Sequence, residues 1–87
     1  MQQLSGQQTF VYQEDRQHFI QEISALRSLA EVVGVATSLL AELDVFKHEV
    51  EHLDARAWEQ KEVRLQSCNE LGRLSLSVLR AYDSRSG

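Results

Sequence analysis

The sequence contains no proline, and its 87 residues include only four glycines, at positions 6, 34, 72 and 87. Proline and glycine are the residues that most often end helices and form tight turns, so this chain has few places at which to reverse direction. A fold of many short strands joined by turns is therefore disfavoured. The composition instead indicates a small number of long helices.

Cysteine occurs once, as Cys68, so the chain cannot form an internal disulfide bond. Nothing indicates a secreted, cross-linked scaffold, and we expect a reducing, cytoplasmic location. The first ten residues, MQQLSGQQTF, lack the basic and apolar regions of a signal peptide. The longest weakly polar run, VVGVATSLLA, is far shorter than the roughly 20 apolar residues that cross a bilayer. We therefore expect a soluble protein that does not insert into membranes.

Basic residues are also scarce, since 9 lysines and arginines face 13 acidic residues and the net charge is −4. Nucleic acids are normally bound by a basic face, so we expect no nucleic-acid partner. The charge is unevenly distributed. Residues 1–54 carry nine acidic and three basic side chains, a net charge of −6, whereas residues 55–87 carry six basic and four acidic ones, a net charge of +2. The two segments would attract each other within or between chains; alternatively, these charges form ordinary solvated faces.

Apolar residues at helical spacing are abundant. Residues 1–12 form a polar, glutamine-rich lead-in, interpreted as a flexible segment that docks through Phe10, Val11 and Tyr12. Across residues 13–53, three adjacent rows repeat every seven residues and predict one long amphipathic helix. The rows are Ala25, Val32, Leu39, Phe46 and Leu53; Leu26, Val33 and Leu40; and Leu29, Ala36, Leu43, Val50 and Ala57.

Gly34 lies inside this predicted helix. Because the apolar rows stay in phase across it, we interpret Gly34 as an internal glycine that weakens the helix by roughly 1 kcal/mol. The alternative is a break within residues 34–38, with Thr37 or Ser38 capping a new helix.

The first pattern fails after Ala57, and residues 54–57 are the predicted hinge. Asp54 is the expected N-cap of a second amphipathic helix over residues 58–82, followed by a tail at 83–87. Its apolar face is predicted to hold one row of Trp58, Leu65, Gly72 and Leu79, a second row of Cys68, Ser75 and Tyr82, and the flanking Leu71 and Val78. Cys68 is therefore expected to be a buried, inert thiol.

Residues 48–52, HEVEH, match H-E-x-x-H, the spacing with which one helix offers two histidines and a general base to a catalytic zinc. His48 and His52 would be ligands, Glu49 the base, and Glu70 a downstream third ligand. However, Val50 falls in an apolar row, so both histidines should project toward open solvent, whereas a catalytic zinc needs an enclosed site. We therefore expect no enzyme activity, no metal and no other cofactor; a zinc hydrolase remains a remote alternative.

The expected fold is all-α, a long helix and a shorter helix forming an antiparallel hairpin or coiled-coil-like bundle. The first stripe is broad, and about 40 residues of helix run ~60 Å against ~40 Å for the second arm, so another chain is expected to complete the bundle. The predicted function is a non-catalytic protein–protein interaction subunit of a larger assembly, which binds protein partners or a copy of itself. A small chaperone that shields a partner's apolar segment is the alternative. The expected partner-binding residues are Phe46, Leu53, Trp58, Leu65, Leu71, Val78 and Tyr82.

Overall fold

The protein is all-α, as the sequence predicts. The computed structural model describes the backbone of residues 2–86 and the side chains of residues 15–84. Its elements are α1 (Gln2–Val33), α2 (Thr37–His52), the single-turn α3 (Ala55–Trp58) and α4 (Lys61–Ser86). The predicted lead-in is helical from Gln2 as part of α1, and the side chains through which it was expected to dock lie outside the described ones.

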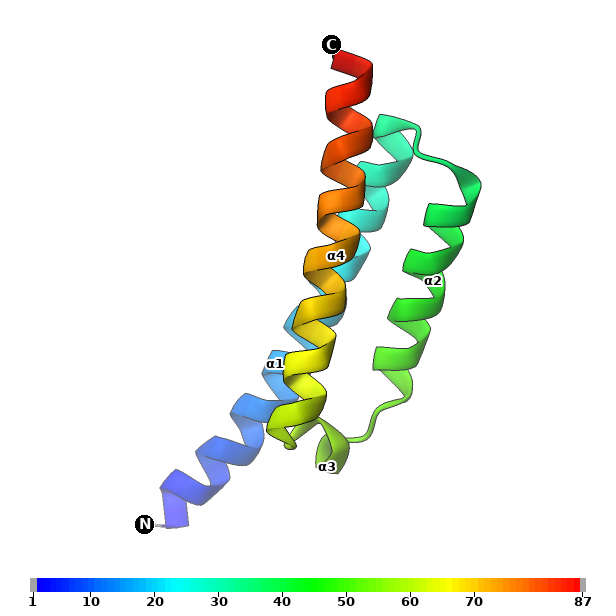
Figure 1. Cartoon of the computed structure of the whole chain (residues 1–87). Helices are drawn as coiled ribbons and strands as arrows, with labels where there is room; N and C mark the ends of the chain where they lie inside the picture. Colours follow the sequence, from blue (N-terminus) through cyan, green and yellow to red (C-terminus); the bar gives the residue numbers. More distant parts are fainter. Residues whose placement is uncertain (1, 87) are drawn as a thin grey trace.

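The three long helices, α1, α2 and α4, form an up-down-up bundle (Figure 1). α2 runs antiparallel to α1, the chain turns through α3, and α4 returns alongside α1. The molecule measures 55 × 20 × 19 Å, and the N-terminal part of α1 runs past α3, beyond the other helices. The bundle therefore contains three long helices where the sequence pattern predicted a hairpin of two.

Gly34 accounts for this difference, and its interpretation as an internal helical glycine was wrong. Its φ is 81°, a left-handed conformation that glycine adopts without a Cβ clash. The amide of Val35 donates to the carbonyl of Ala30 (3.2 Å), and the amide of Gly34 donates to the backbone carbonyl of Glu31 (3.1 Å). These two bonds form the Schellman motif that ends many helices. The 13–53 stretch is consequently divided between α1 and α2.

The alternative, a break near residues 34–38, is confirmed, but the cap of α2 is not at Thr37 or Ser38. Ala36 occupies the N-cap position, and its methyl side chain cannot accept a hydrogen bond from the first turn. Its carbonyl accepts from the amides of Leu39 (3.0 Å) and Leu40 (3.2 Å). The backbone alone therefore begins this helix.

Asp54 is an N-cap, as predicted, but it caps the single-turn α3 and not the second long helix. Its Oδ1 accepts a hydrogen bond of 2.7 Å from the amide of Ala57, in the first turn of α3. At the same bend, Arg16 of α1 donates to the carbonyl of Leu53. Trp58, the predicted start of the second helix, belongs to α3, and α4 begins at Lys61.

The core lies where the three long helices meet. Its largest fully buried side chains are Ile23, Leu43, Val50, Leu74 and Val78. At the α3 end, Phe19 packs against Phe46 edge-on with ring centroids 5.9 Å apart, and against Trp58 at 5.3 Å. Each buried side chain of this size stabilises the fold by roughly 1.5–3 kcal/mol.

Only part of the broad first stripe is covered. Of its members, Val33, Leu43, Phe46 and Val50 are buried, whereas Val32 is 84% exposed and Leu29 is 47% exposed. The other buried side chains of α1, Phe19, Ile23 and Ala30, lie outside the predicted rows. Because the chain reverses direction at Gly34, α1 and α2 are separate antiparallel helices, so rows that are continuous in sequence do not form one continuous face. Among the described residues, no helix is long and apolar enough to span a membrane.

Candidate protein-interaction surface

Helix α4 has apolar residues on two separate faces. Its inner face, which holds Ser67, Leu71, Leu74 and Val78, packs into the bundle. A second face holds a set of exposed residues that we call the outer stripe: Leu65, Cys68, Gly72, Leu76 and Leu79. At 100° per residue, the mean directions of the two faces differ by about 130°.

The leucines of the outer stripe are well exposed. Leu65 is 57% exposed, Leu76 56% and Leu79 52%. A side chain covered by the chain's own helices would lie nearer the 0% of Leu74. The outer stripe is therefore apolar surface that the described part of this chain leaves open.

Small residues occupy the middle of the outer stripe. A Cβ added to Gly72 would meet no other atom within 4 Å, so space is open there. Cys68 is exposed, and the expectation of a buried thiol was wrong, because it faces away from α1 and α2. Another helix could approach α4 closely at this point.

The predicted partner-binding residues divide between core and surface. Phe46, Trp58 and Val78 are buried in the bundle. Leu53 and Leu71 are partly buried and pack against the same core. Leu65 and Tyr82 remain exposed, and Leu65 belongs to the outer stripe. The exposed Leu76 and Leu79 were both absent from the predicted set, although Leu79 stood in the same predicted seven-residue row as Leu65.

The HEVEH segment lies at the end of α2. Val50 is 1% exposed and faces the core, so His48 and His52 lie on the exposed side of the helix, as expected. Their rings are 4.2 Å apart, and Nδ1 of His52 donates to the carbonyl of His48 (2.9 Å). Glu49 and Glu70, in contrast, line a groove between α2 and α4. Within the described residues, no three His, Cys, Asp or Glu side chains are grouped to hold a metal ion.

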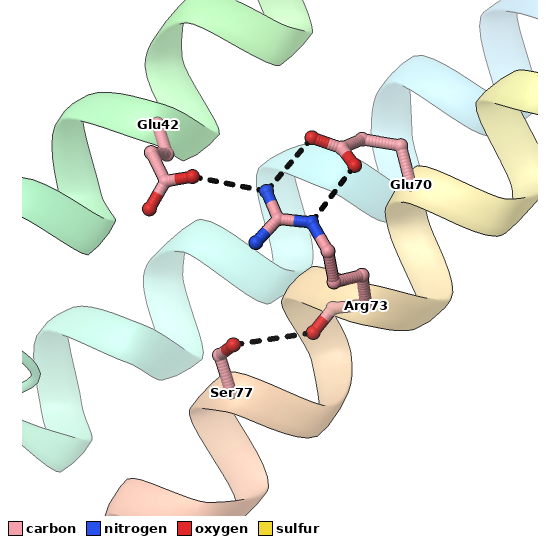
Figure 2. A network of polar contacts seen from close by, with 4 residues as sticks. All are labelled: Glu42, Glu70, Arg73 and Ser77. Atoms are coloured by element: carbon pink, nitrogen blue, oxygen red, sulfur yellow. Dashed lines mark hydrogen bonds and ion pairs between the residues drawn. The ribbon is translucent and has the colours of Figure 1, made fainter.

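An ion-pair network crosses this groove (Figure 2). Arg73 of α4 donates through Nε and Nη2 to the two carboxylate oxygens of Glu70, each at 2.9 Å, and through Nη2 to Glu42 of α2, also at 2.9 Å. The hydrogen bonds from Arg73 hold the pKa of Glu70 below its usual value. The Glu42–Arg73 pair joins the acidic and basic segments of the sequence, in the direction that their charges predict.

A second pair links α1 to α2. Arg27 donates to Asp44 through Nε (2.7 Å) and Nη2 (3.3 Å), and also binds Glu31. The hydrogen bond from Arg27 lowers the pKa of Asp44. Both networks therefore join helices of one bundle, and neither occupies the outer stripe.

Comparisons with known protein families, with curated proteins and with solved structures found no match to this chain.

Proposed function

We propose that this protein is a non-catalytic helical interaction subunit of a larger protein assembly, and that it binds another protein chain through the outer stripe of α4. The proposal rests chiefly on one observation: α4 carries a second, exposed apolar face, separate from the one that it buries in its own bundle. Three leucines on that face are each more than half exposed, and covering them with another chain would remove apolar surface from water.

The surroundings of the stripe support protein binding. Its five members recur at the three- and four-residue steps with which a helix docks against another helix. Gly72 at its centre leaves room for a close approach. We also propose that the protein works without a cofactor in a reducing, cytoplasmic setting, where the exposed Cys68 thiol would stay reduced.

Photo-crosslinking in the cells that naturally produce the protein tests this function. A benzoylphenylalanine replaces Leu79 on the outer stripe or, as the matched control, His48 on the exposed side of α2. We expect a discrete protein adduct from position 79 and none from position 48. A changing mixture of adducts from position 79 would instead indicate a chaperone, and no adduct from position 79 would contradict the proposed function.

A further inference from the structure

We propose that the chain covering the outer stripe is a second copy of this protein, with its α4 antiparallel to the first and related to it by a two-fold axis near Gly72. This inference rests on the proposed function, since it names the partner of the same surface. Three properties of α4 support it: the spacing of the stripe, the charges on its flank and the open space at its centre.

The spacing of the stripe is symmetric. From Leu65 to Leu79, successive members are separated by three, four, four and three residues, with Gly72 in the middle. Read in either direction along the helix, the pattern is the same. A two-fold interface requires such self-complementarity, because each residue that contacts a second residue across the axis is contacted by it in return. Leu65 would then lie opposite Leu79 of the second copy, and Cys68 opposite Leu76.

The charges beside the stripe favour the antiparallel orientation. Glu62 and Arg80 are 18 residues apart, which is five helical turns, so both point to the same flank of α4. Both are exposed, and neither makes an ion pair within the part of the chain that the structure describes. Antiparallel pairing centred near residues 71–72 places Glu62 of each copy beside Arg80 of the other. Parallel pairing in register would instead leave Glu62 and Arg80 about 27 Å apart along the helix axes, so the two could not pair.

The centre of the stripe permits close contact. Gly72 lies on the proposed axis, where two helices come nearest, and it has no side chain to hold them apart. The remaining cation on this flank, Arg73, is already held by Glu70 and Glu42, so its charge is balanced within its own copy. Two stripes can therefore meet without an unpaired charge at the centre.

Charge reversal tests the proposal, with dimer dissociation constants measured by sedimentation equilibrium at low salt and folding checked by circular dichroism. Glu62→Arg and Arg80→Glu each turn both intermolecular pairs into repulsions, and each should weaken the dimer about tenfold. An equimolar mixture of the two variants should form a dimer as tight as wild type, since each copy then supplies the charge that the other needs. The chain carrying both substitutions should also pair normally.

Glu51→Arg and Arg56→Glu are matched controls, because they change the net charge equally at exposed positions off α4. Neither control should weaken the dimer, and their mixture should dissociate like wild type. The antiparallel pairing would be overturned if none of the α4 charge reversals weakened the dimer. It would also be overturned if the mixture of Glu62→Arg and Arg80→Glu did not regain the wild-type dissociation constant. A monomeric chain that crosslinks at position 79 to a different protein would overturn the self-pairing and leave the proposed function standing.

The register has its own test. In Leu76→Cys, the introduced thiol should lie beside the native Cys68 of the second copy, and mild oxidation should link the dimer covalently. In His48→Cys, which puts the new thiol on the exposed side of α2, the same treatment should link few dimers. Equal linking of the two variants would overturn the proposed register.

Discussion

Gly34 and Asp54 determine where the helices of this chain turn. The role of Asp54 is local, because its carboxylate accepts a hydrogen bond from the amide three residues further along the chain. The residue type and the loss of the apolar pattern after Ala57 are therefore enough to predict this N-cap from the sequence. The role of Gly34 is not local in this sense. A glycine in phase with apolar rows fits both a helix interior and a helix end, and only the packing of α2 against α1 selects the left-handed conformation.

Gly34→Ala should lower the free energy of unfolding by about 1–2 kcal/mol, because alanine is strained at a φ of 81°. Gly72→Ala is the control: it lies inside a helix with open space around it, and should stabilise a single copy by about 0.5–1 kcal/mol. Urea unfolding at concentrations where the chain is monomeric measures both changes. If the two substitutions had the same effect, Gly34 would not be the turn.

At the scale of single elements, α4 could be predicted only in part. Its helical character and its heptad rows follow from the sequence, but the rows of Leu65 and of Cys68 were expected to form its apolar face, and both residues are exposed. The flanking Leu71 and Val78, with Leu74, face the core instead. Periodicity identifies apolar faces without saying which one the rest of the chain covers, and α4 has two.

Truncation of the two faces should have opposite consequences. Leu74→Ala removes a fully buried side chain and should lower the free energy of unfolding by about 3 kcal/mol. Leu79→Ala should change it by less than about 0.5 kcal/mol in the monomer, since this side chain is half exposed. Urea unfolding of the dilute variants distinguishes them. A large loss from Leu79→Ala would mean that α4 buries its outer face within the same chain.

At the scale of the whole molecule, the break at Gly34 changes which apolar surface is left for another chain to cover. A continuous helix over residues 13–53 would have exposed one long stripe, whereas the folded-back α2 covers much of it and leaves the bundle with its own core. Among the side chains of residues 15–84, the exposed large apolar ones lie chiefly on α4, together with Leu29, Val32 and Val45. A bundle of this size buries only about 60% of its unfolded surface, so pairing would add substantially to its stability.

The most direct test of self-pairing through α4 is the molar mass of the chain in solution, measured by light scattering over a range of concentrations. The wild-type protein should pass from the 9.9 kDa monomer toward twice that mass as concentration rises. A variant with both Leu65→Lys and Leu79→Lys should remain monomeric while keeping its helical content. A wild-type chain that stays monomeric at every concentration, or a variant that still dimerises, would contradict self-pairing through α4.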